Sequence, residues 1–238
     1  MDINDIVNRR SDLSTFLVHL SRADGEESAA DRLESILTRK VIEARSMYGH
    51  LKRRLEHEGR QLDSQKVVCF TETPLEFTNL MVEPIDHRNF RFAPYGIAIT
   101  KKMGRQSGIN PVWYLDMTPG HTWLTNNLDR LAERFLQGGA IDDDLASIFP
   151  FVEHMGRGQT AFGENYRKEF WWEREWRHVG DFRLPLTLIC LCPEDEIPRF
   201  TDCLEQADIN GKCVDPRWSL EKIIARLAGF TAADVNIL

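Results

Sequence analysis

The sequence predicts an α+β fold, with a split, mainly antiparallel sheet and peripheral helices. Short β-branched and apolar segments alternate with amphipathic segments of helical period, and many strand ends are bounded by Pro or Gly. No G-x-G-x-x-G follows a predicted strand and no Walker A loop occurs, which argues against Rossmann and P-loop folds. The length of 238 residues, without repeats or a Pro/Gly/Ser-rich linker, predicts a single domain over 1–238.

The composition predicts a globular protein without membrane contact. With 42% hydrophobic and 28% charged residues, the chain is typical of a globular protein with a real core. It has no apolar run of about 18 residues and no apolar stretch at its N-terminus, so we expect a cytoplasmic protein without membrane contact. Five cysteines without a CxxC pair predict reduced thiols and no metal site. They are Cys69, Cys190, Cys192, Cys203 and Cys213.

The net charge of -7 argues against broad, non-specific affinity for nucleic acid. One segment is nevertheless basic: between Arg39 and Arg60 there are seven Lys or Arg against three Glu. Two interpretations stay open for it, a solvated helix face or an edge that faces a polynucleotide.

The first half of the chain alternates strands and helices. Segment 15–21 is β-branched and apolar and predicts a strand, as does 66–72. Apolar residues near helical spacing predict a helix over 28–45, with Ser28 as its N-cap. Segment 75–82 is expected to form one or two helical turns.

The middle of the chain predicts a hairpin and then a long helix. Segments 95–101 and 111–116 look like paired strands, because the residues between them are polar and rich in Gly. Segment 122–139 has the pattern of an amphipathic helix that ends at Gly138-Gly139.

The last third predicts a strand around 170–178, a buried strand over 186–192, and helices over 193–207 and 219–230. We place the core of the domain at about 13–195, followed by a helical C-terminal segment over 196–238.

The stretch FWWEREWRHVG, 170–180, holds the most informative residues. If it is extended, side chains alternate between its two faces. One face then carries two carboxylates, a guanidinium and an indole: Glu173, Glu175, Arg177 and Trp171. Trp172 and Trp176 point to the core. Surface ion pairs are the simplest explanation of such a pair of glutamates. Carboxylates beside aromatics also suit the stabilisation of an oxocarbenium-like sugar.

The order of motifs resembles one branch of the ADP-ribosyltransferases, which includes DarT-like toxins and tRNA 2′-phosphotransferases. LVHLSR with the later LESIL resembles its opening motif, VCFTETPL its middle strand, and KEFWWEREWR its late-strand glutamate. FAPYGIAITK, PVWYLD and EREWR further resemble the AbiGi family of bacterial phage-defence proteins. The resemblance covers about 13–195.

The resemblance implies an ADP-ribosyltransferase-like fold with NAD as donor. By this resemblance, His19 contacts the ribose of NAD, and the backbone of Leu20 and Ser21 binds the nicotinamide. Phe70 and Thr71 belong to the strand of the middle motif. Tyr95 is the candidate aromatic wall of the nicotinamide pocket. Glu173 or Glu175 is the catalytic carboxylate, and Arg177 binds pyrophosphate or neutralises the carboxylates. No Gly-rich phosphate loop is present, and the arginine of the NAD loop stays open among Arg22, Arg45, Arg53 and Arg54.

The function that the resemblance implies is mono-ADP-ribosylation by the toxin of an anti-phage or toxin–antitoxin system. A nucleic acid, RNA or DNA, is the favoured acceptor, and a protein acceptor stays open. An antitoxin or chaperone protein is an expected partner. The alternatives are a catalytically inactive module of the same fold, acting as antitoxin or phage sensor, and an NAD-hydrolysing enzyme.

Overall fold

The computed structural model describes residues 9–85, 90–118, 120, 123–137, 146–159, 165–231 and 234. The chain divides into two compact units. Unit 1 comprises Met1–Val41, Phe70–Ser107 and Arg183–Leu238, and unit 2 comprises Ile42–Cys69 and Gly108–Phe182. The chain passes between the units within the strands β2 (Val41–Ile42), β4 (Lys66–Thr71) and β11 (Phe182–Arg183), and once after Ser107. Both units are discontinuous in sequence, so the single domain stays a prediction.

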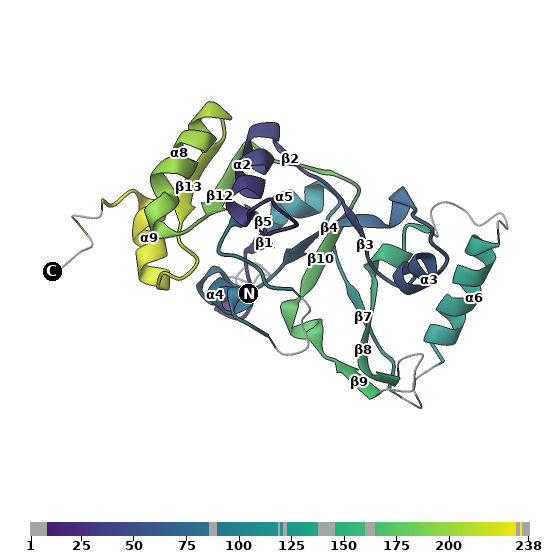
Figure 1. Cartoon of the computed structure of the whole chain (residues 1–238). Helices are drawn as coiled ribbons and strands as arrows, with labels where there is room; N and C mark the ends of the chain where they lie inside the picture. Colours follow the sequence, from purple (N-terminus) through teal and green to yellow (C-terminus); the bar gives the residue numbers. More distant parts are fainter. Residues whose placement is uncertain are drawn as a thin grey trace. The chain divides into compact units, whose positions relative to one another are not determined.

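Unit 1 contains a sheet whose strands are mostly antiparallel (Figure 1). In sheet order they are β13 (Asn210–Val214), β12 (Thr187–Leu191), β5 (Gly96–Thr100), β1 (Phe16–Leu20) and the end of β4. Only the edge pair β12–β13 is parallel among these. The helical elements are α2 (Ala29–Arg39), η2 (Leu75–Phe77), α4 (Thr78–Val82), α5 (Lys101–Gln106), η5 (Glu194–Glu196), α8 (Ile197–Gln206) and α9 (Leu220–Ala228). The predicted mixture of helices with a mainly antiparallel sheet is therefore confirmed.

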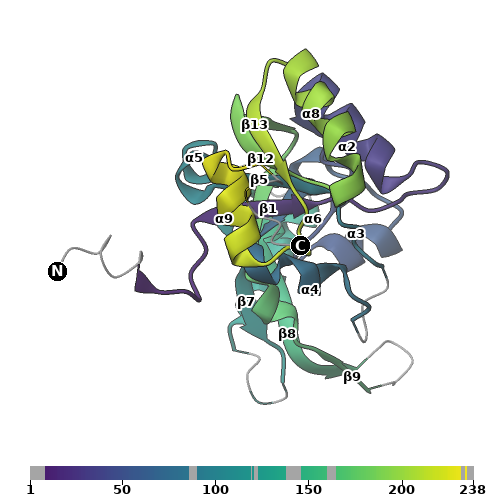
Figure 2. The same ribbon diagram turned by 90° about the vertical axis from the view of Figure 1, so that its left-hand side faces the viewer.

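The strand register of unit 1 separates two buried faces. Val18, Ala98 and Ile189 are cross-strand neighbours, and they pack with Met81 of α4 and Ile223 of α9. The next residue along each strand points to the opposite face. That face is covered by α8, which lies beside α2 (Figure 2). Arg199 of α8 joins the two helices through an ion pair with Glu34, Nη2 to Oε2 at 2.6 Å.

Ser28 caps α2 as the sequence predicts, since its hydroxyl accepts from the N–H of Asp31 at 3.1 Å. We expect Ser28→Ala to lower the free energy of unfolding by about 1 kcal/mol, because one N–H of the first turn loses its acceptor. Urea unfolding measures the loss. Ser28→Thr keeps a capping hydroxyl and should retain most of the stability. Equal losses in both variants would show that the capping hydroxyl is not the source of the stability.

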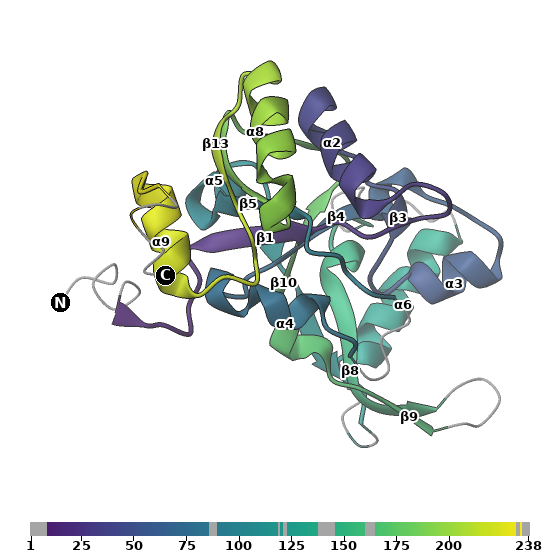
Figure 3. The same ribbon diagram turned by 60° about the vertical axis from the view of Figure 1, so that its left-hand side comes forward.

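The described residues of unit 2 form two groups of strands. The first is β3 (Ser46–Met47), the start of β4, β10 (Glu175–Val179) and β6 (Asn110–Pro111); the second is β7 (Trp113–Asp116), β8 (Val152–Gln159) and β9 (Asn165–Lys168). The helical elements are α3 (Lys52–His57), η1 (Asp63–Gln65), α6 (Thr125–Leu136), η3 (Phe149–Phe151) and η4 (Phe170–Glu173). Leu55 of α3, Ala132 of α6 and Phe149 form one buried cluster, and Figure 3 shows the two helices side by side.

Several predicted elements differ from the structure. The predicted hairpin of 95–101 with 111–116 is wrong: β5 pairs with β1 and β12, while β6 pairs with β10 and β7 with β8. The polar residues between those segments form α5. The helix predicted over 28–45 ends at Arg39, because Lys40 adopts a left-handed conformation with φ 53°. The C-terminal segment, expected to be helical, also supplies β13. The expected helix end at Gly138-Gly139 lies outside the described residues.

Candidate functional site

The segment around the two predicted carboxylates is a helical turn followed by a strand. The turn η4 ends at Glu173, and β10 begins at Glu175. Between them Arg174 has φ 48°, and its N–H donates to the carbonyl of Trp171 at 3.1 Å. The alternation predicted over 170–178 is therefore wrong before Glu175, and Glu173 and Glu175 do not share a strand face.

This turn determines how exposed each tryptophan of the segment is. Trp176, within β10, is 9% exposed, in agreement with its predicted place in the core. Trp172 lies in η4 and is 38% exposed, so its predicted burial is wrong. Trp171 is more exposed still, and its indole N–H donates to Glu169 at 3.1 Å.

Arg177 of β10 is buried and binds two carboxylates. Its Nε donates to Oε1 of Glu175 at 2.9 Å, and its Nη2 donates to Oε2 of the same carboxylate at 2.8 Å. Nη2 also donates to Oε2 of Glu153 at 2.7 Å, and Nη1 donates to the carbonyl of Pro150. Both oxygens of Glu175 thus accept from one guanidinium in the bidentate arrangement that gives arginine its strongest ion pairs. We call Arg177, Glu175 and Glu153 the carboxylate–arginine network.

Glu153 is the second acid of this network. Lys168 binds its other oxygen, so the carboxylate lies between two cations. Burial raises the pKa of Glu153, but the charges of Arg177 and Lys168 outweigh burial and lower this pKa to about 2. Tyr114 accepts the N–H of Glu175 at 3.2 Å, and burial together with the charge of Glu175 raises the pKa of its phenol well above the usual value. Arg177 and Lys168 together supply two positive charges against the two carboxylates, Glu153 and Glu175.

A second polar cluster in unit 2 joins His50, His154 and Asp129. Nδ1 of His50 lies 2.9 Å from Nε2 of His154, and Nε2 of His50 lies 3.0 Å from Oδ1 of Asp129. The carboxylate of Asp129 only accepts, so Nε2 of His50 carries a proton and Nδ1 accepts from His154 in the neutral pair. Burial lowers the pKa of both imidazoles, and for His154 burial and the neighbouring His50 lower it to about 4.

Gly49 allows His50 to reach this position. It has φ 90°, and a Cβ there would lie 2.1 Å from the carbonyl oxygen of Phe149. The N–H of His50 donates to that same carbonyl at 3.0 Å. A side chain at this position would push the two segments apart, so glycine is required immediately before His50.

In unit 1 the residues predicted to bind NAD are divided between the two faces of the sheet. The His19 ring contacts that of Phe70, with centroids 5.8 Å apart. The register places Ile97 and Cys190 in the same cross-strand row as His19, on the face covered by α8. Leu20 packs in the core of the opposite face, and Thr71 is the cross-strand partner of Val18 on that face.

The backbone of Ser21, predicted to contact nicotinamide, is fully used within unit 1. Its N–H donates to the carbonyl of Tyr95 at 2.7 Å, and its carbonyl accepts from the N–H of Ala93 at 3.0 Å. Tyr95 packs its ring on Phe200 of α8, with centroids 5.9 Å apart, and its hydroxyl donates to Glu196. The geometry thus joins the predicted residues to the core of unit 1; their roles toward NAD stay predictions.

The basic segment from Arg39 to Arg60 is largely paired within itself. Each of its three glutamates binds a basic neighbour: Arg45–Glu43 at 2.9 Å, Lys52–Glu56 at 4.0 Å and Arg60–Glu58 at 3.0 Å. Among the other candidates for pyrophosphate binding, Arg54 pairs with Glu58, and Arg22 lies over the ring of Phe90, 4.5 Å from its centroid. This pairing favours the interpretation of a solvated helix face.

The structure brings together polar residues that sequence reasoning did not select. Glu153 lies 24 positions before Arg177, and His154 lies 104 positions after His50. Neither spacing matches a motif, so only the packing of η3, β8 and β10 reveals these contacts. The carboxylate–arginine network holds its charges in fixed ion pairs, and both carboxylate oxygens of Glu175 accept hydrogen bonds from Arg177.

A family model with the description "Putative abortive phage resistance protein AbiGi, antitoxin" matches residues 34–192, about two thirds of the chain. No curated protein and no solved structure matches the chain. None of the helices in the described ranges combines the length and the apolar character that crossing a bilayer requires.

Proposed function

The chain belongs to the AbiGi family of putative abortive phage resistance proteins, and from this membership we propose that it is an antitoxin, a module that binds a toxin protein and restrains it. The observation that carries the proposal is the match over 34–192 to a family whose description names an antitoxin. A binding module needs a stable surface and no catalytic group.

The carboxylate–arginine network supports a structural role for Glu175. A catalytic glutamate of a transferase holds its carboxylate free for the developing cation on the ribose. Here Arg177 binds both oxygens of Glu175, and Arg177 is itself buried. An acid neutralised in this way adds little electrostatic stabilisation to an outside cation, because the positive charge of Arg177 opposes it.

Unit 1 supports the same conclusion. The N–H and carbonyl of Ser21 are bonded to Tyr95 and Ala93, and the hydroxyl of Tyr95 is bonded to Glu196. An incoming nicotinamide would have to break backbone bonds before it could use those of Ser21. The fold therefore already uses the backbone of Ser21 and the hydroxyl of Tyr95 for internal hydrogen bonds.

The competing proposal is the ADP-ribosyltransferase toxin, with NAD as donor and RNA or DNA as acceptor. It rests on motif order alone, and it assigns the chemistry to Glu173 or Glu175. The two proposals predict opposite effects of the isolated chain on a bacterial cell.

Expression of the chain alone is expected to leave bacterial growth unchanged, and its co-expression with the product of the adjacent gene is expected to rescue cells from that product. The physical reason is direct binding, so the two proteins should also co-purify. Purified chain incubated with labelled NAD and separate pools of RNA, DNA and protein should label none of them and release no ADP-ribose.

Glu173→Gln gives a clean control, because Glu173 lies outside the carboxylate–arginine network. An antitoxin should keep its rescue and its binding with this change. Growth arrest by the chain alone, abolished by Glu173→Gln or Glu175→Gln, would overturn the proposal and support the transferase. Circular dichroism of each variant separates loss of chemistry from loss of fold.

A further inference from the structure

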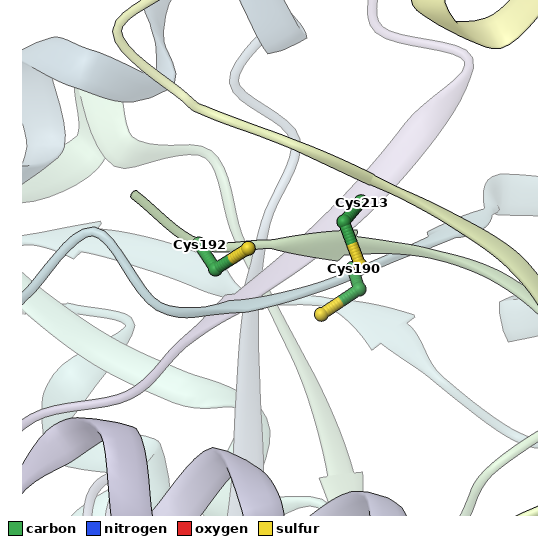
Figure 4. A group of neighbouring side chains, drawn as sticks. All are labelled: Cys190, Cys192 and Cys213. Carbon is green, nitrogen blue, oxygen red and sulfur yellow. The ribbon is translucent and has the colours of Figure 1, made fainter. Parts of the chain in front are cut away.

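Three of the five cysteines meet in the core of unit 1. Cys190 lies in β12 and Cys192 directly follows the last residue of that strand, so their side chains, two positions apart, share one face of the sheet. Cys213 of β13 is the direct partner of Cys190 in the parallel ladder, which places it on the same face. Figure 4 shows the three side chains, two on these neighbouring strands and that of Cys192 beside the end of β12. We call Cys190, Cys192 and Cys213 the thiol trio.

The three sulfur atoms are close enough to hold one ion. They all lie within 4.8 Å of one another. Metal–thiolate bonds of about 2.3 Å place the sulfurs of a trigonal site about 4 Å apart, so only a small contraction would be needed. No other group of three His, Cys, Asp or Glu in the described part of the chain meets this criterion.

The surroundings of the thiol trio exclude water. The exposed fractions of Cys190, Cys192 and Cys213 are 0%, 0% and 1%. Thr201 of α8 covers the trio, with its hydroxyl oxygen 3.8 Å from Sγ of Cys213. Arg226 of α9 donates from Nε to the carbonyl of Cys213 at 3.3 Å, which brings one positive charge near the site. An ion held here would be enclosed, as in structural metal sites.

We propose that the thiol trio is a binding site for a thiophilic cation, with Cu(I) preferred over Zn(II). Soft thiolates select Cu(I), Zn(II) and iron–sulfur centres over hard cations, which need oxygen ligands. Zn(II) in a closed site takes four ligands. The group in the described residues consists of three sulfurs, with no fourth His, Cys, Asp or Glu beside them. Three sulfurs match the lower coordination of Cu(I).

The ion can reach the site from the edge of the sheet. β13 is the terminal strand of the sheet order in unit 1, so opening of a single strand exposes the trio. Each thiol that binds as thiolate releases its proton to the solvent, and binding therefore becomes tighter as pH rises.

The test uses the full chain, kept reduced and free of oxygen. Cu(I) alone and Zn(II) alone are titrated in parallel against a competing chelator, and the metal retained per chain is measured after desalting. We expect one Cu(I) per chain and a thiolate-to-copper charge-transfer band.

Cys190→Ser and Cys213→Ser should each weaken Cu(I) retention by about tenfold or more, since loss of even an outer partner of a metal ligand costs about that much. Cys203→Ser is the matched control, because Cys203 lies on α8 of the same unit but outside the trio. Cys213→Ala keeps the site apolar and serves if the serine variants fail to fold. Equal retention by the unaltered chain and Cys213→Ala, absence of Cu(I) binding, or retention of Zn(II) without Cu(I) would each overturn the proposal.

Discussion

Replacement of Arg177 by methionine is expected to lower the free energy of unfolding by about 3–5 kcal/mol at pH 7. The methionine leaves Glu175 and Glu153 without the guanidinium that binds both, in a position that is 1% exposed in the unaltered chain. An uncompensated buried carboxylate either keeps its charge at high cost or takes up a proton. Urea unfolding followed by circular dichroism measures the loss.

Arg167→Met is the matched control. Arg167 also binds a carboxylate, that of Glu169 at 2.8 Å, but its side chain is 65% exposed. Its replacement should cost less than about 1 kcal/mol. Adding Glu175→Gln to Arg177→Met should recover part of the loss, because one unpaired carboxylate is removed. A loss below about 1 kcal/mol for Arg177→Met would show that the network does not stabilise the fold.

Acidification from pH 7 to pH 5 is expected to cost the protein about 2 kcal/mol of stability through His154 alone. The folded state depresses the pKa of His154 to about 4 from an ordinary value of 6.5. The stabilising contribution is complete above pH 6.5, where the imidazole is neutral in both states. It declines as pH falls toward 4, because the unfolded chain binds a proton that the folded chain rejects. Urea unfolding at the two pH values measures the difference.

Several charged groups surround this imidazole, and they define the controls. His50 and Asp129 lie in the same cluster, while Glu153, Lys168 and Arg53 act on His154 through their charges. His154→Gln keeps a donor toward His50 and removes the titration, so its loss between pH 7 and 5 should be about 2 kcal/mol smaller. His57→Gln, at an exposed position of α3, should leave the difference unchanged. An unchanged difference in His154→Gln would contradict the assignment.

Local patterns predicted the elements of the fold better than their pairing. The cap at Ser28 and the helix over 219–230 depend on neighbours a few residues apart, and both appear in the structure. The predicted hairpin failed because β5 takes its partners from β1 and β12, far away in sequence. Chain order says little about which distant strands meet, since closure of a long loop costs only slightly more entropy than closure of a short one.

In the candidate site, too, local features were easier to predict from the sequence than contacts between distant segments. The alternating residues of 170–178 favoured a strand, but one left-handed residue, Arg174, ends a helical turn there. Sequence placed Arg177 beside the glutamates, and the structure pairs it with Glu175. The contact of Glu153 with Arg177 and that of His50 with His154 could not be predicted from the sequence, because both depend on how β8 packs. The thiol trio was missed because the parallel pairing of β13 with β12 carries no CxxC signal.

The position of β1 has a practical consequence for anyone preparing fragments of this protein. β1 lies between β5 and β4 in the sheet order, yet residues 16–20 precede the region matched by the family model. A fragment cut at 34 and 192 would also lack α8, β13 and α9. It would leave β5 open on the side that pairs with β1, and β12 open on the side that pairs with β13. Such open strand edges invite pairing between chains and aggregation. The boundaries of family membership are therefore unsuitable boundaries for expression, and partner-capture experiments need the whole chain.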